Sequence, residues 1–102
     1  MRIIVAGAGV TGYLLLKMLV AKKHDVVVID INRETCEEVY AETGAMTIHG
    51  SATDLRILKK AGTQNSDVFL CLVRHDSDNL AIAILAKSLG VPSIIALLRK
   101  PE

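Results

Sequence analysis

The chain opens with Arg2-Ile3-Ile4-Val5-Ala6-Gly7-Ala8-Gly9-Val10-Thr11-Gly12, a stretch whose pattern changes from strand to helix around its glycines. The apolar first half predicts a buried β-strand over residues 2–6. The apolar residues that follow the glycines predict a helix over residues 10–22. This stretch therefore predicts a strand, a tight turn and a helix in immediate succession.

The glycines at positions 7, 9 and 12 have the spacing of a dinucleotide-binding turn. Gly7 permits the tight turn, Gly9 lets a pyrophosphate approach the backbone, and Gly12 lets the helix pack close to the strand. We expect the backbone N–H groups of Gly9, Val10 and Thr11 to face the phosphates at the helix N-terminus.

Asp30 ends the next apolar run, Asp25–Asp30, which predicts the second strand. An acid at this position would accept hydrogen bonds from the hydroxyls of an adenosine ribose. The same carboxylate would repel a 2′-phosphate. Asp30 together with the glycine turn therefore predicts a nucleotide site that prefers NAD to NADP.

Strand and helix patterns alternate along the rest of the chain. Further strands are expected at 46–49, 67–73 and 93–98, the first of them short and at the sheet edge. Further helices are expected from an Asn32 cap to about 42, from a Thr53 cap over 54–61, and from Asp76 or Ser77 to Gly90. Short connections and right-handed crossovers make this a doubly wound, Rossmann-like parallel α/β sheet of strand order 3-2-1-4-5. Residues 1–102 are interpreted as one domain.

Composition excludes several classes of protein. The residues are 51% hydrophobic but only 3% aromatic, which indicates an aliphatic core, and the net charge of +1 gives no case for nucleic acid or an anionic membrane. The apolar run Tyr13–Ala21 is too short to span a bilayer and contains Lys17. No signal peptide or metal-ligand spacing is recognised, and Cys36 and Cys71 are interpreted as reduced structural thiols. We therefore expect a cytoplasmic location.

Two polar loops follow the third and fourth predicted strands. They read Gly50-Ser51-Ala52-Thr53-Asp54 and Val73-Arg74-His75-Asp76-Ser77-Asp78-Asn79. Because the carboxyl ends of parallel strands meet at one edge of the sheet, both loops should border the crevice that the glycine turn borders.

With these loops, Asp30 and the Leu58–Gly62 segment, the chain resembles the regulator-of-potassium-conductance family of nucleotide-binding domains, which includes the Trk-type potassium-uptake branch (TrkA N-terminal-like). The resemblance covers essentially all of residues 1–102. The family's first loop usually reads glycine-aspartate-alanine-threonine and helps to hold adenine. Gly50, Ala52 and Thr53 match that pattern, and Ser51 stands where the acid is usual.

The second loop matches the family only in part. The family usually has a threonine, then two residues, then an aspartate, and an asparagine three positions further on. Asp76 and Asn79 fit, whereas Val73 replaces the threonine and Arg74 takes a position that is normally small or polar. Arg99 follows the last predicted strand, where the family also has arginine.

Several candidate residues allow two interpretations. Arg74 would reach a phosphate or remain a solvated charge, and Arg33 would lie over adenine or on the exposed face of its helix. Asn79 would contact the ligand or form helix-end hydrogen bonds, and Arg99 would meet a nucleotide, a partner subunit or only solvent. The predicted binding residues are Gly7, Gly9, Val10, Thr11, Gly12, Asp30, Ile31, Arg33, Gly50, Ser51, Ala52, Val73, Arg74, Asn79 and Arg99.

The resemblance implies a regulatory domain rather than an enzyme. Such a domain would bind NAD(H), with ATP or ADP possible, and would control a membrane potassium channel or transporter through rearrangement of a dimer or ring. The adjacent His75 and Asp76 do not by themselves make a catalytic pair, and we expect no catalysis. The alternative is the cofactor-binding domain of an NAD-dependent oxidoreductase whose catalytic part lies beyond Glu102. A scaffold used only for protein contacts is a third hypothesis.

Self-association is expected from the helix patterns. Residues 13–21 and 80–86 are apolar around nearly the whole helix circumference, whereas a helix with one solvated face shows a polar stripe. One side of each helix would cover the sheet, and the other would meet a neighbouring helix or subunit. The family usually carries a sixth strand and a final helix, which we expect residues 1–102 to lack.

Overall fold

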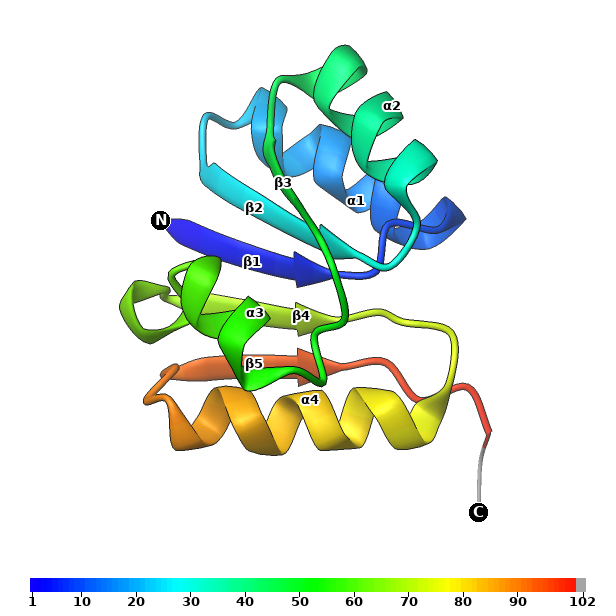
Figure 1. Cartoon of the computed structure of the whole chain (residues 1–102). Helices are drawn as coiled ribbons and strands as arrows, with labels where there is room; N and C mark the ends of the chain where they lie inside the picture. Colours follow the sequence, from blue (N-terminus) through cyan, green and yellow to red (C-terminus); the bar gives the residue numbers. More distant parts are fainter. Residues whose placement is uncertain (101–102) are drawn as a thin grey trace.

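The computed structural model describes residues 1–100, which form a five-stranded parallel sheet of order β3-β2-β1-β4-β5 (Figure 1). This order and the parallel pairing confirm the predicted Rossmann-like fold, with β3 at one edge. The strands are β1 (Arg2–Ala6), β2 (Asp25–Asp30), β3 (Met46–His49), β4 (Val68–Cys71) and β5 (Ser93–Ala96).

The helices alternate with the strands, as predicted. A short 3-10 helix, η1 (Thr63–Asn65), was not predicted because three residues are too few to show a hydrophobic period. The helices are α1 (Val10–Ala21), α2 (Arg33–Thr43), α3 (Leu55–Lys60) and α4 (Asp76–Ser88). None of those in the described part of the chain is long and apolar enough to cross a membrane.

The sheet separates two apolar layers. Along β1, Ile4 faces the layer that contains Leu58 of α3 and Ile82 of α4. Its neighbour Val5 faces the layer that contains Leu16 of α1. Strand side chains alternate between the two faces, so both faces of β1 are buried from Ile3 to Ala6 and these residues are all apolar.

The glycine turn has the close packing that the sequence predicts. Gly7 adopts φ +94°, a left-handed conformation that suits glycine, and its N–H donates to the Ile29 carbonyl at 2.9 Å. A Cβ atom added to Gly12 would collide with the Gly7 carbonyl oxygen. The start of α1 therefore lies directly against the turn that follows β1.

The start of α3 corrects one predicted cap. We expected Thr53 to cap a helix over 54–61, but the helix begins at Leu55 and Asp54 is the cap. The Asp54 carboxylate accepts from the Arg56 N–H at 2.9 Å, while the Thr53 hydroxyl is 2.6 Å from the Ser51 hydroxyl. Thr53 therefore does not cap the helix, because its hydroxyl is hydrogen-bonded to Ser51 in the preceding loop.

Both strands at the far side of the sheet are shorter than predicted. The expected ranges 67–73 and 93–98 are observed as 68–71 and 93–96. The chain stays extended for one more residue, since Leu97 N–H donates to the Cys71 carbonyl at 3.0 Å. Pairing then ends because the Asn79 side chain takes the backbone groups of Val73 and the carbonyl of Leu97.

Other helix ends agree with the sequence to within two residues. Asn32 caps α2 by accepting from Thr35 N–H, and Gly44 ends that helix at φ +73°. The helix α1 ends at Ala21 rather than residue 22, and α4 ends at Ser88 rather than Gly90. Of the two predicted starts of α4, the structure has Asp76.

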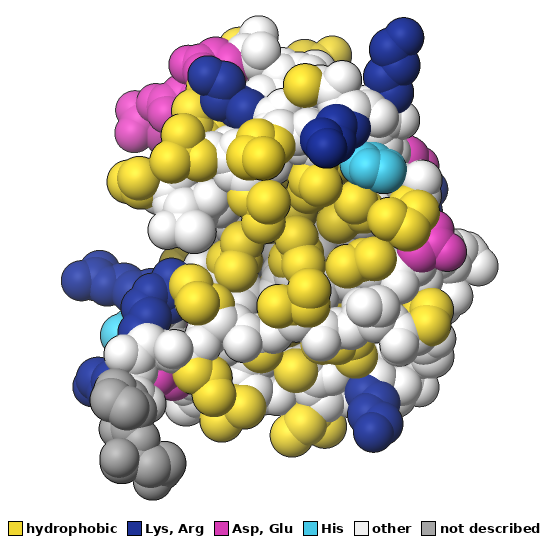
Figure 2. Space-filling model, turned by 180° about the vertical axis from the view of Figure 1, so that it is seen from behind, with side chains coloured by type: hydrophobic (Ala, Val, Ile, Leu, Met, Phe, Trp, Pro, Cys, Tyr) yellow, Lys and Arg dark blue, Asp and Glu magenta, His cyan; other side chains and the backbone are white. Residues whose placement is uncertain are grey.

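Apolar side chains remain exposed on the helices and on β5. Figure 2 shows hydrophobic side chains gathered across the middle of the face opposite that of Figure 1. Ile95 is 57% exposed, and its neighbours on β5, Ile94 and Ala96, point into the other layer. Leu14 and Met18 of α1 are exposed to a similar extent. One face of β5 is thus uncovered among the described residues.

Replacing Gly12 with alanine should destabilise the fold by about 1–3 kcal/mol, because the new methyl group meets a backbone carbonyl that cannot change rotamer. Thermal and urea unfolding would measure this change. The matched control is Gly9→Ala, since Gly9 has φ −67° and no atom within 4 Å of an added Cβ. The control should change stability by about 0.5 kcal/mol or less. Equal stability of the two variants would contradict the packing role of Gly12.

Candidate functional site

A cavity of about 850 Å³ lies at the carboxyl ends of the strands. It receives residues from the turns after β1, β2, β3 and β4, as expected at the switch point of a doubly wound sheet. Most of the predicted binding residues line it together: Gly7, Gly9, Asp30, Ile31, Gly50, Ser51, Ala52, Val73, Arg74 and Arg99.

The glycine turn forms the floor of the cavity. Gly9 is the residue before the first turn of α1, and no atom lies within 4 Å of the position that its Cβ would occupy. The first N–H groups of a helix have no partner inside the helix, and they carry the positive end of the helix dipole. The space above Gly9 therefore suits an anionic group such as a pyrophosphate.

Asp30 is held in a fixed orientation between the turn and the end of β2. One carboxylate oxygen accepts from Ala8 N–H and the other accepts from Asn32 N–H, both at 2.8 Å. Each oxygen of a carboxylate has a second lone pair, so two acceptor positions remain for a ligand. The geometry can hold a diol beside the glycine turn.

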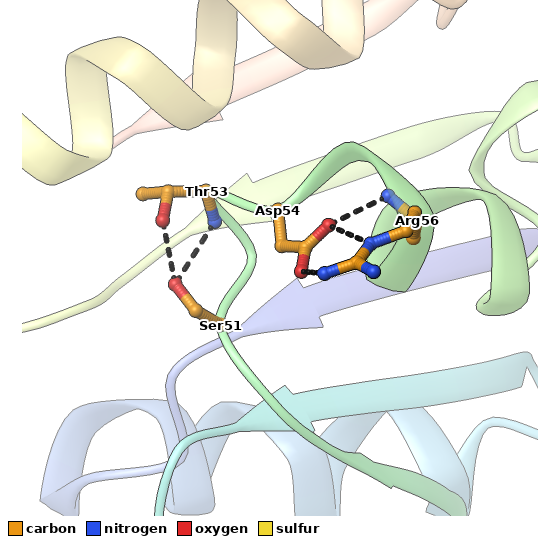
Figure 3. A network of polar contacts seen from close by, with 4 residues as sticks. All are labelled: Ser51, Thr53, Asp54 and Arg56. Atoms are coloured by element: carbon orange, nitrogen blue, oxygen red, sulfur yellow. Dashed lines mark hydrogen bonds and ion pairs between the residues drawn. The ribbon is translucent and has the colours of Figure 1, made fainter.

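The loop between β3 and α3 contains two separate polar contacts (Figure 3). The Ser51 hydroxyl accepts from Thr53 N–H at 3.2 Å and also pairs with the Thr53 hydroxyl. The Asp54 carboxylate instead accepts from the guanidinium of Arg56 at 3.0 Å, and that hydrogen bond lowers the pKa of Asp54. The hydroxyls line the cavity, whereas the Asp54–Arg56 pair does not.

On the other side of the cavity, Asn79 organises the loop after β4. Its buried side chain accepts from Val73 N–H at 2.9 Å and donates to the carbonyls of Val73 at 3.1 Å and Leu97 at 2.8 Å. The sequence left open whether Asn79 contacts a ligand or forms hydrogen bonds at the helix end, and the structure shows the hydrogen bonds. Asn79 does not line the cavity, so it positions Val73 rather than offering its own amide to a ligand.

Asp76 and Arg99 connect the same loop to the segment after β5. The Asp76 carboxylate accepts from the N–H groups of Arg99 and Lys100, both at 2.9 Å, and these hydrogen bonds lower the pKa of Asp76. The Arg99 guanidinium donates to the Val73 carbonyl at 2.6 Å while it lines the cavity. Asp76 is therefore engaged with backbone, and the structure gives no sign of a His75–Asp76 pair.

Four other predicted residues do not line this cavity. Gly12 is buried against the turn and has a packing role, and Arg33 is exposed on α2. Val10 and Thr11 have exposed side chains on α1. Only their backbone N–H groups, at the helix start, remain candidates for a phosphate. The readings of Arg33 over adenine and of Gly12 as a ligand contact have no support from the cavity lining.

Other lining residues were missed by the sequence reasoning. Thr35 lies on the first turn of α2, and its position gave no periodic signal that could mark it as a site residue. Ala8 and Thr53 belong to stretches that were already recognised and could have been included with their neighbours. The missed lining residues are Ala8, Ile29, Thr35, Thr53, Leu72, His75, Asp78 and Ile82.

Neither cysteine takes part in the cavity. Both Cys36 and Cys71 are free and buried, and burial raises the pKa of Cys71 to about 11. Burial likewise raises the pKa of Cys36, assisted by the nearby Asp30 charge. Thiols of this kind are poor nucleophiles at neutral pH. Within residues 1–100, no three His, Cys, Asp or Glu side chains gather in a way that could hold a metal ion.

The fold and the cavity define a Rossmann-type domain with the layout of a nucleotide site. The family model for the TrkA-N domain matches residues 3–102, and the chain belongs to this family. The Trk system potassium uptake protein TrkA homolog of Pyrococcus abyssi is 40% identical over 99 residues, which are 97% of this chain and 43% of that protein. The chain thus spans less than half the length of this relative and of two further archaeal ones, and all three are named as potassium uptake proteins, not as enzymes.

Solved structures agree with this fold. The GsuK channel superposes with a TM-score of 0.85 at 24% identity, over 98% of this chain and 18% of that chain. The GsuK channel bound to NAD superposes with a TM-score of 0.81 at 22% identity, over 92% of this chain and 17% of that chain. At these identities the likeness is evidence for the fold alone.

Replacing Asn79 with alanine should destabilise the domain by roughly 3 kcal/mol, because it leaves the partly buried Val73 N–H and Leu97 carbonyl without the partner that the amide gives them. Urea unfolding monitored by circular dichroism would give the value. Asn65→Ala serves as the control, since Asn65 is exposed at the end of η1, and its replacement should be nearly neutral. A neutral Asn79→Ala variant would show that the loop after β4 does not depend on this side chain.

Proposed function

We propose that this domain is the nucleotide sensor of a potassium uptake system or channel, and that it binds NAD(H) in preference to ATP or ADP. The observation that carries the proposal is the cavity itself. A glycine turn at a helix N-terminus and an oriented carboxylate, Asp30, share one continuous space. These two groups suit the pyrophosphate and the ribose of one adenine nucleotide.

The ligand would lie across the sheet from β3 to β4. Its pyrophosphate would rest above Gly9, and its adenosine ribose would donate to the free lone pairs of Asp30. A 2′-phosphate would bring a second negative charge against Asp30, so NADP should bind less well than NAD. That a structural neighbour was solved as a channel bound to NAD supports the choice of NAD(H).

Two cations face the opposite end of the cavity. Arg74 and Arg99 both line it from the side of β4 and β5. Arg99 uses one guanidinium nitrogen to hold the Val73 and Arg74 carbonyls, so its other N–H groups remain available to an anion. The charge of the ligand at this end would therefore act directly on the loop after β4.

This loop offers a route from ligand to neighbouring structure. Asp76, Asn79 and Arg99 bind the loop to residues 97–100, the segment that follows β5. A ligand that contacts two arrangements of this segment differently can shift their balance by its differential affinity, typically about 1–3 kcal/mol. In the proposed assembly, a cytoplasmic dimer or ring of such domains acts on a membrane potassium transporter or channel subunit, with self-association through the exposed apolar faces of α1 and α4.

Calorimetry with NAD, NADH, NADP, ATP and ADP tests the site directly. NAD or NADH should bind most tightly, and Asp30→Ala should weaken each adenine nucleotide by about tenfold or more, the effect of losing hydrogen bonds to a charged group. Asp25→Ala is the matched control, because Asp25 lies at the other end of β2 and outside the cavity. Tightest binding of NADP, or unchanged affinities in Asp30→Ala, would refute the assignment.

The regulatory part of the proposal needs a separate experiment on the full-length assembly. Small-angle scattering should differ between the NAD, NADH, ATP and ADP states, and potassium flux in cells lacking their own regulator should differ in parallel. Asp76→Asn should bind nucleotide but reduce the difference, because a neutral amide holds the Arg99 and Lys100 N–H groups more weakly. Identical scattering and flux in every state would leave a binding domain without a switching role.

A further inference from the structure

The order of the strands fixes which part of a nucleotide meets which loop. Moving along the sheet edge, the cavity is bordered by Ser51 after β3, Asp30 at the end of β2, and Gly9 after β1. Adjacent strands are about 4.8 Å apart, so these groups succeed one another at the spacing of base, ribose and phosphate. A nucleotide with its ribose on Asp30 and its phosphates above Gly9 therefore places its base against the loop between β3 and α3.

That loop offers hydroxyl groups to the base and no free carboxylate. Ser51 and Thr53 line the cavity, whereas Asp54 points to Arg56 and accepts from its backbone N–H, Nε and Nη2 (Figure 3). Among residues 1–100, the carboxylates that do line the cavity are Asp30 and Asp78. Asp30 lies beside the ribose, and Asp78 belongs to α4 on the far side of the glycine turn.

The two hydroxyls form a hydrogen-bonded pair in which either group can be the donor and the other the acceptor. Their oxygens are 2.6 Å apart, and either one can be the donor. Whichever donates, the other hydroxyl keeps a hydrogen that can point into the cavity. The Thr53 N–H occupies one further lone pair of Ser51, so unused lone pairs also remain on the two oxygens. The pair can thus donate to a ligand or accept from it without losing its own hydrogen bond.

We propose that the Ser51–Thr53 pair contacts position 6 of the bound purine and accepts 6-amino and 6-oxo purines alike. An amino group at this position donates to the free lone pair, and an oxo group accepts the free hydroxyl hydrogen. A carboxylate could serve only the first of these, because it has lone pairs and no hydrogen. The inference rests on the proposed nucleotide site and makes Ser51 the residue that sets its base specificity.

The test compares ADP with IDP, which differ only in the group at position 6 and the proton on N1. Calorimetry on the whole chain should give dissociation constants within about threefold of each other, since each purine finds a partner for its edge. Ser51→Asp should weaken IDP relative to ADP by about tenfold or more, because the 6-oxo group then faces lone pairs. Ser51→Asn, with both a donor and acceptors, should keep the ratio near that of the unmodified chain.

The control variant is Ser88→Asp, which adds the same charge at an exposed position of α4 outside the cavity, and it should leave the ratio unchanged. IDP binding ten times weaker than ADP in the unmodified chain would overturn the inference and leave the nucleotide site intact. An unchanged ratio in a folded Ser51→Asp variant would overturn it as well. Failure of ADP, IDP and NAD alike to bind would instead refute the proposed function, and the inference with it.

Discussion

The hydrogen bond from Ala8 N–H to the Asp30 carboxylate connects the two halves of the site, and the rest of the cavity depends on it. It attaches the glycine turn to the end of β2, and the neighbouring Gly7 N–H to Ile29 carbonyl bond continues the sheet up to that point. The other Asp30 oxygen accepts from Asn32 N–H, at the cap of α2. One side chain therefore fixes the turn, the strand end and the next helix start. A ligand would meet acceptor positions that are already oriented, so little ordering would be needed on binding.

The sequence was sufficient to predict the repeating strand and helix units of the fold. Apolar strands buried on both faces, glycine or asparagine at helix ends, and short connections specify a parallel sheet, and the glycine spacing after the first strand indicated the Rossmann type, whose strand order is the observed one. The cavity lining was predictable where a residue lies in a loop after a strand. Thr35 lies on a helix instead, and its approach to the cavity depends on how α2 packs, which no local pattern encodes.

Side chains that act on backbone were harder to predict. From the sequence alone, Asn79 could contact a ligand or form hydrogen bonds to the backbone. The positions of the Val73 and Leu97 backbone groups show that it does the second. The same holds for the ends of β4 and β5, because propensity cannot show that an amide from α4 will compete with strand pairing. Thr53 and Asp54 are both good helix caps by residue type. The choice between them was decided by Ser51, which engages the threonine hydroxyl.

Two features of the last part of the chain are related: one face of β5 is uncovered, and the segment that contains Arg99 is held by side chains of α4. Leu97 N–H still pairs with the Cys71 carbonyl of β4, and the segment is otherwise held by the side chains of Asn79 and Asp76. Asn79 and Asp76 also hold the loop after β4 that borders the cavity, while Ile95 nearby lacks a covering layer. An anion in the cavity would bind the N–H groups that the Arg99 guanidinium does not use for the Val73 carbonyl. The side chain that would meet the ligand therefore also holds the segment that follows β5.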